Sequence, residues 1–146
     1  MTPDDLLQVD IHGIPFEGTG KVTSSWITHS SVYVNFPSIN AVIHAHPRFA
    51  TVFAAASQPI VPFLEGMRKF GTIPSLSGKN KVDSPEFAVE VVETLRLNQK
   101  TLENFGHGVL YPRHGVLVAA PNLEDAYDLL DRIESNAIAL LFSKLL

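Results

Sequence analysis

The sequence predicts a layered α/β domain in which short apolar strands pack against amphipathic helices. Strand-like and helical segments alternate along the chain in the order strand, helix, strand, helix, helix, paired strands and helix, which is typical of layered folds. The last segment has the strongest helical pattern. Its apolar side chains recur at helical spacing on one face: Leu123, Ala126, Leu129, Leu130, Ile133, Ala137 and Leu141.

The first third of the chain supplies two strands and the helix between them. Residues 6–11 mix apolar and polar side chains and predict a short strand, whereas the Gly, Ser and Thr content of residues 19–25 predicts a loop. Ser24 or Ser25 is a suitable N-cap for a helix that runs to about residue 35. Residues 40–46 then predict a short buried strand.

Caps and breakers predict the remaining elements. Pro47 favours the first turn of a helix to about residue 56, and three prolines and two glycines make residues 58–77 mostly loop, with a strand near residues 72–73. Ser84, followed by proline, predicts a helix to about residue 98. Residues 109–120 predict two strands bent around residues 112–115, and Asn122 predicts the N-cap of the final helix.

Bulk composition restricts the class of protein. The length of 146 residues predicts a single domain over residues 1–146, and 45% apolar and 18% charged residues are ordinary for a globular protein. Cysteine is absent, so no thiolate serves as nucleophile or ligand. The net charge of −4 argues against broad nucleic-acid binding. Without a signal-peptide pattern or a membrane-length apolar run, we expect a cytoplasmic protein with no membrane partner.

Three histidines are candidates for a metal site. His44 and His46 stand two residues apart on a predicted strand, where alternate side chains share a face, so both imidazoles can reach one ion. Taken alone, this pair leaves open a metal site or ordinary surface or core histidines. His114, at a bend between predicted strands, adds a third imidazole. Three neutral imidazoles suit Zn²⁺ or another borderline divalent ion and leave a position for water or substrate.

The other three histidines are not predicted ligands. His29 lies on a predicted helix face, where it is expected to neighbour a metal site at most and not to bind the ion. His12 and His107 neighbour glycines and are expected in turns.

Two ordered blocks of the sequence resemble the class II aldolase/adducin-head family. The first comprises residues 26–33, WITHSSVY, and residues 36–47, FPSINAVIHAHP. The second comprises residues 108–118, GVLYPRHGVLV, followed by LEDAY and IE at residues 123–127 and 133–134. The likeness covers roughly residues 2–139 and is poor in the middle loop. It implies a three-layer αβα sandwich with a largely antiparallel central sheet.

The resemblance also implies a cofactor, a reaction class and an assembly. In that family the His-x-His pair and the histidine before glycine ligate a divalent metal, usually zinc, which here implies His44, His46 and His114. The implied activity is a metal-dependent lyase of aldolase or dehydratase type on a small hydroxyketone or sugar phosphate. Such chemistry needs a Lewis acid and a group that moves a proton. A homo-oligomer is implied as well, and the apolar residues 137–146 agree with one.

Two departures from the family pattern bear on catalysis. Family aldolases carry a glutamate acid/base where this chain has Ser25, and a hydroxyl of ordinary pKa cannot replace a carboxylate as base. The chain also begins after the family's N-terminal phosphate-binding elements, near a Thr-Pro-x-Asp-Leu segment. Thr23 and Ser24 are what remains of the phosphate-binding groups, and with Ser25 they are the expected substrate-binding residues.

Glu65 is the expected catalytic residue. Some family dehydratases take their acid/base from a glutamate after the His-x-His helix, and Glu65 occupies that region, close to Arg68 and Lys69. The alternative for Glu65 is a solvated loop carboxylate. At the level of the whole chain, a metal-dependent lyase competes with a non-catalytic aldolase-like module of structural or regulatory role. A third reading is a fragment completed by another chain.

Overall fold

The centre of the molecule is a three-stranded antiparallel sheet with β5 between β3 and β4. The structure is a computed structural model that describes residues 2, 5–143 and 145. The strands are β3 (Ala41–Ala45), β4 (His107–Tyr111) and β5 (Gly115–Ala120). Every residue of β4 and β5 is buried, because helices cover both faces of this apolar segment.

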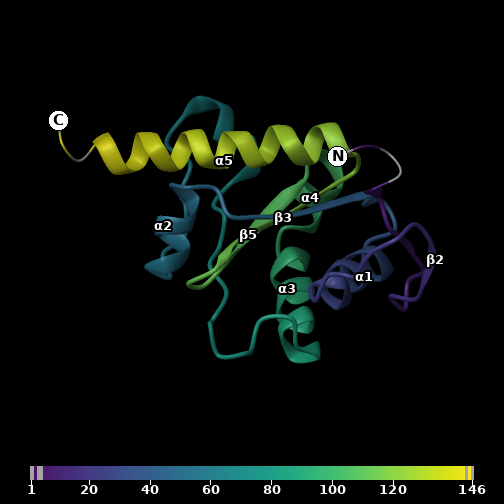
Figure 1. Cartoon of the computed structure of the whole chain (residues 1–146). Helices are drawn as coiled ribbons and strands as arrows, with labels where there is room; N and C mark the ends of the chain where they lie inside the picture. Colours follow the sequence, from purple (N-terminus) through teal and green to yellow (C-terminus); the bar gives the residue numbers. More distant parts are fainter. Residues whose placement is uncertain (1, 3–4, 144, 146) are drawn as a thin grey trace.

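Helices form a layer on each side of the sheet (Figure 1). One layer contains α2 (Ala50–Ala55) and α5 (Leu123–Ser143), and the other contains α1 (Trp26–Asn35), α3 (Pro85–Arg96) and α4 (Gln99–Phe105). Alternate residues of β5 pack against the two helical layers. Those facing the first layer are Val116, Val118 and Ala120, and those facing the second are Leu117 and Ala119. The predicted three-layer αβα sandwich with an antiparallel sheet is confirmed.

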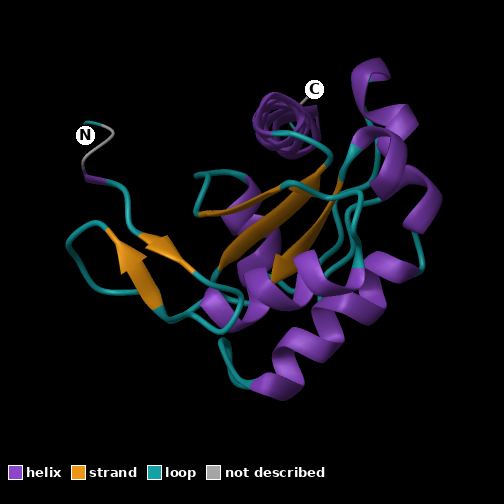
Figure 2. Cartoon of the chain, turned by 90° about the vertical axis from the view of Figure 1, so that its right-hand side faces the viewer, coloured by secondary structure: helices purple, strands orange, loops and turns teal. Residues whose placement is uncertain are grey.

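An N-terminal hairpin lies to one side of this sandwich, as Figure 2 shows. Its strands are β1 (Gln8–Val9) and β2 (Pro15–Glu17), which pair antiparallel. β1 confirms the centre of the strand predicted at residues 6–11, whereas β2, three residues long, was not predicted. Gly13 is required in the turn, because it has φ +79° and a Cβ there would lie 2.7 Å from the Trp26 ring. Pro3 and Asp4, part of the family-like opening segment, lie outside the described residues.

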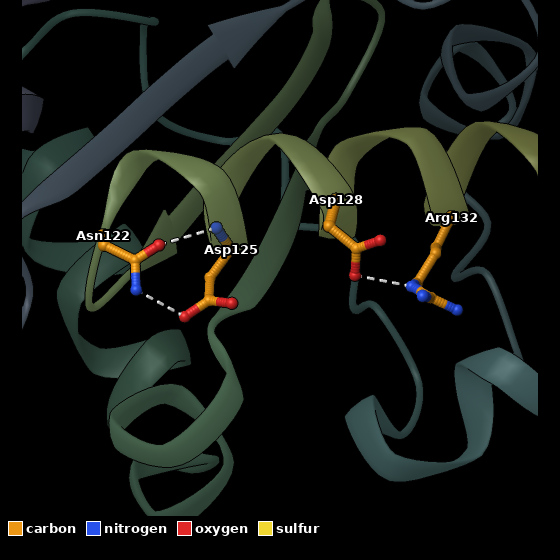
Figure 3. A network of polar contacts seen from close by, with 4 residues as sticks. All are labelled: Asn122, Asp125, Asp128 and Arg132. Carbon is orange, nitrogen blue, oxygen red and sulfur yellow. Dashed lines mark hydrogen bonds and ion pairs between the residues drawn. The ribbon is translucent and has the colours of Figure 1, made fainter.

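Both predicted helix caps in the second half of the chain are confirmed. Asn122 Oδ1 accepts a hydrogen bond from the backbone N–H of Asp125 at 2.8 Å (Figure 3). Further along α5, Arg132 pairs with Asp128 at 2.6 Å in the same view. Ser84 Oγ accepts from the backbone of Phe87 at 3.2 Å and caps α3. These caps are local, so they can be inferred from a few neighbouring residues.

Several boundaries differ from the prediction. Helix α4 was missed, because it is short, has no side-chain cap and buries only Leu102. Helix α2 begins at Ala50, after a turn that starts at Pro47. The strand expected near residues 72–73 is a single bridge between Ile60 and Ile73. Leu123 is 64% exposed and does not belong to the buried stripe of α5.

The fold also includes a 3₁₀ helix, η2 (Glu65–Phe70), in the segment predicted to be loop. It packs against α4 and α5. Across residues 2, 5–143 and 145, no helix combines the length and hydropathy that crossing a bilayer requires.

Candidate metal centre

The structure brings the three predicted ligands together at one end of the sheet. One ring nitrogen of each of His44, His46 and His114 lies within 4.8 Å of the other two. The Nε2 atoms of His46 and His114 are 3.2 Å apart, although the two residues are 68 positions apart in sequence. Their rings meet edge to face, with centroids 4.8 Å apart.

Sheet register explains this meeting. Strand β3 runs antiparallel to β5, with His44 opposite Leu117 and Ala45 opposite Val116, so the end of β3 lies beside the β4–β5 turn. That turn carries His114, whose N–H donates to the Tyr111 carbonyl at 3.0 Å. Gly115 is needed next, because a Cβ there would collide with the Ala45 carbonyl and lie 2.7 Å from the His46 ring. The His-Gly dipeptide therefore lets the two histidine-bearing segments approach.

The three residues fit a divalent ion. Two nitrogens bound to one ion at ~2.05 Å and a tetrahedral angle are separated by ~3.3 Å, close to the 3.2 Å found between His46 and His114. His44 Nε2 is buried and has no hydrogen-bond partner in the described part of the chain. Burial, followed by the charges of His114 and His46, lowers the pKa of His44 to about 4. At neutral pH its lone pair is therefore free for a metal ion.

Ser25 supports His44 directly. Its side chain is buried, and its Oγ lies 3.4 Å from His44 Nδ1. Ser25, one of the two predicted N-cap residues, occupies the N-cap position of α1, but its side chain makes no capping hydrogen bond. The hydroxyl is turned toward the imidazole instead, where it fixes the orientation of a predicted ligand. Substrate contact by Ser25 stays a prediction.

Thr23 and Ser24 are on the outer side of this region, and both are exposed. Thr23 lines a cleft of about 330 Å³ between the hairpin and α1, together with Lys21 and His29. Its hydroxyl accepts a hydrogen bond from Ser25 N–H at 3.3 Å. Ser24 does not line that cleft.

Glu65 is not part of the histidine group. It is the first residue of η2, its side chain is 85% exposed, and it pairs with Arg68 at 3.3 Å. Within the described residues, the group that could hold a metal ion contains histidines alone. This placement agrees with the alternative of a solvated carboxylate, and the geometry of one chain gives no support to an acid/base role for Glu65.

Sequence reasoning missed how the end of β3 is held in place. The Glu134 carboxylate on α5 accepts hydrogen bonds from Phe49 N–H at 2.9 Å and Ala50 N–H at 2.8 Å. These are free donors at the start of α2, where Phe49 has no side-chain oxygen to serve as a cap. The contact fixes the chain three residues after His46. The sequence signal for this contact was the absence of a polar N-cap residue at the start of α2.

Two further residues near the sheet, His107 and Tyr111, are buried. His107 was expected in a turn, but it begins β4 and is fully buried, because the chain enters the sheet directly after Gly106. Tyr111 packs on Phe87, with ring centroids 4.6 Å apart. Its ring also lies 5.0 Å from that of His44. Its buried hydroxyl has no partner among the described residues.

Comparison with known proteins agrees with this fold. Residues 1–141 match the Class II Aldolase and Adducin N-terminal domain family. The chain is 31% identical to a probable L-ribulose-5-phosphate 4-epimerase, UlaF, of Mycoplasma pneumoniae, with 100% of this chain and 64% of the relative covered.

Solved structures give the same relationship. An L-fuculose 1-phosphate aldolase is 26% identical with a TM-score of 0.79, covering 99% of this chain and 65% of that one. The L-fuculose-1-phosphate aldolase of Thermus thermophilus is 29% identical with a TM-score of 0.77, covering 99% and 72%. This chain thus spans less than two thirds of the length of the first two of these relatives. It belongs to the class II aldolase and adducin N-terminal domain family.

Proposed function

We propose that the chain is a divalent-metal-dependent lyase of aldolase or dehydratase type, acting on a small hydroxyketone or sugar phosphate. The observation that carries this proposal is the convergence of three imidazole nitrogens from His44, His46 and His114. Zinc is the proposed ion, because three neutral imidazoles suit it. The family relatives, named for L-ribulose 5-phosphate and L-fuculose 1-phosphate, support a sugar-phosphate substrate.

Different residues of the chain would take different roles in such a site. A bound divalent ion supplies positive charge that stabilises negative charge developing on the substrate oxygen. The buried surroundings keep His44 neutral, Ser25 orients its ring, and Glu134 holds the segment after His46. In the cleft along α1, Lys21 and Thr23 offer a cation and a hydroxyl for the anionic end of a phosphorylated substrate. Ser24, on the exposed rim, remains a proposed substrate contact.

A non-catalytic module is the second candidate. It is favoured by the serine at position 25 and by the exposure of Glu65, which together leave the family's two expected carboxylates absent from the histidine group. This alternative predicts a protein that binds metal and turns over nothing.

Proton exchange in heavy water separates these candidates. Zinc-loaded protein would be incubated with dihydroxyacetone phosphate in D₂O, and loss of the C–H signal would be followed by NMR. We expect exchange with zinc-loaded protein and no exchange above background with metal-stripped protein, because the ion would stabilise the negative charge that forms when the proton leaves. L-Ribulose 5-phosphate and L-fuculose 1-phosphate would be tested for turnover in parallel. Folded, metal-loaded protein that neither exchanges nor turns over substrate would favour the non-catalytic module.

A homo-oligomer is also proposed. The end of α5 exposes Ile138 and Phe142, and Leu145 is 77% exposed, while Lys144 and Leu146 lie outside the described residues. Apolar side chains gathered at one end of a helix are typical of an interface. Sedimentation equilibrium should give a mass that is a multiple of 16.0 kDa, and a monomer at all concentrations would contradict the proposal. A cytoplasmic location and a single domain over residues 1–146 likewise remain proposals.

A further inference from the structure

The cleft between the N-terminal hairpin and α1, which lie side by side in Figure 1, has a mainly apolar and aromatic wall. Its volume of about 330 Å³ is at the lower end of the range for small-molecule sites. The apolar residues that line it are Leu7, Val9, Ile11, Val22 and Trp26. A sugar phosphate is polar throughout and would leave this apolar surface unused, so the wall indicates a ligand with an apolar part.

Three ring-bearing side chains of α1 line one side of the cleft. Trp26, His29 and Tyr33 recur at helical spacing and therefore share one face of the helix. The hairpin turn packs against the Trp26 ring, so closely that a Cβ on Gly13 would lie 2.7 Å from it. The Tyr33 hydroxyl accepts a hydrogen bond from the N–H of Val42 at 3.1 Å, which turns it toward β3. What α1 offers to a ligand is therefore mainly ring surface, which suits a planar aromatic group.

Several polar groups of the cleft wall are already engaged within the chain. Asp10 Oδ1 accepts hydrogen bonds from the N–H groups of His12 and Ile14, at 2.9 and 2.8 Å, in the hairpin turn. The Ser30 hydroxyl donates to the carbonyl of Ile27 at 3.1 Å within α1. The one carboxylate of the wall is thus held by backbone donors and is not needed to bind a ligand.

Lys21 and Thr23 are the polar groups that remain for a ligand. Lys21 is exposed and forms no ion pair with any residue that the structure describes. The Thr23 hydroxyl accepts from the Ser25 N–H at 3.3 Å and keeps its own proton to donate. Because the two residues are only two positions apart, the cation and the donor lie at the same side of the cleft. An anionic group placed there would receive charge-assisted hydrogen bonds.

We propose that this cleft binds a small aromatic anion, with its ring against α1 and its charged group at Lys21 and Thr23. Such a ligand uses both the ring-lined wall and the free cation. The inference shares with the proposed function only the assignment of Lys21 and Thr23 to an anionic group, and it requires neither bound metal nor turnover. Phenyl phosphate combines the two features and is the probe.

The single tryptophan of the chain reports on this cleft directly. Trp26 gives the one indole N–H signal in a proton–nitrogen NMR spectrum, so that signal needs no assignment. Phenyl phosphate, inorganic phosphate and benzyl alcohol would be titrated separately into the whole chain. We expect phenyl phosphate to shift the indole signal to saturation and to bind at least ~10-fold more tightly than inorganic phosphate, because its ring buries apolar surface. Benzyl alcohol has the ring without the charge and should bind about 10-fold more weakly than phenyl phosphate.

Lys21→Gln tests the charged end of the cleft. It should weaken phenyl phosphate binding by roughly 10-fold, because a hydrogen bond between two charged groups is lost. Lys100→Gln is the matched control, since Lys100 is an exposed lysine on α4 that does not line the cleft. His114→Ala separates the cleft from the histidine group, and this variant should bind phenyl phosphate as wild type does.

Each contrary result would overturn the inference and leave the metal-dependent lyase standing. An unmoved Trp26 signal would mean that the cleft does not bind the probe. Equal binding of inorganic phosphate, or wild-type binding in Lys21→Gln, would remove one half of the proposed recognition. Loss of binding in His114→Ala would place the probe on the metal, and a Trp26 signal that moves on dilution of the protein alone would mean that a second copy fills the cleft. Failure of the proposed function would be detected separately, by metal content and proton exchange without phenyl phosphate.

Discussion

Replacing His114 with alanine is expected to abolish stoichiometric metal binding while leaving the chain folded. The variant removes one of three clustered donors, and two imidazoles with solvent make a much weaker site. Loss of a partner that only orients a ligand typically costs about 10- to 100-fold in affinity, and loss of a ligand itself should cost more. The backbone bond between His114 and Tyr111 does not depend on the side chain, so the turn should form.

The measurement is the metal content of protein purified without a chelator or an affinity tag. His12→Ala is the control, because His12 is exposed in the hairpin turn and lies outside the histidine group. Bound metal should also stabilise the wild type, by ~2.7 kcal/mol when the free ion is at 100 times its Kd, and this gain should vanish in His114→Ala. An empty wild type whose stability is unchanged in the variant would exclude the metal-dependent lyase.

Local patterns made much of the fold predictable. The apolar stripe on α5 and the caps at Ser84 and Asn122 depend on residues a few positions apart. The structure contains the stripe and the two caps. The predicted layers follow from these elements, because amphipathic helices and a buried strand must share their apolar faces. His44 and His46 were predictable as a pair for the same reason, since alternate residues on a strand share a face.

Features that depend on tertiary contacts could not be predicted. Ser25 has the chemistry of a cap, yet its hydroxyl turns to His44, a residue 19 positions away. The start of α2 is capped by Glu134 across 84 positions, which no local window contains.

His107 gives the second large effect, a loss of stability as pH falls. It is fully buried at the start of β4, and neither ring nitrogen has a hydrogen-bond partner in the described chain. Burial lowers its pKa from 6.5 to about 4, and the backbone of Phe70 opposes this shift only in part. Between these two values the unfolded chain binds a proton that the folded chain does not, so the free energy of unfolding falls as pH decreases. At ~1.36 kcal/mol per pKa unit, this one group accounts for about 3 kcal/mol.

His107→Leu separates this effect from that of His44, whose pKa is lowered similarly. Leucine is close in volume and needs no hydrogen bond, so the variant should be at least as stable as wild type at neutral pH. Urea unfolding of both metal-free proteins, from neutral pH down to the pKa of the folded state, measures the difference. The advantage of the variant should grow by ~1.4 kcal/mol per pH unit below 6.5, because one proton no longer distinguishes its unfolded and folded states. Parallel stability curves would mean that the His107 ring binds a proton equally in the folded and unfolded states, and would contradict this prediction.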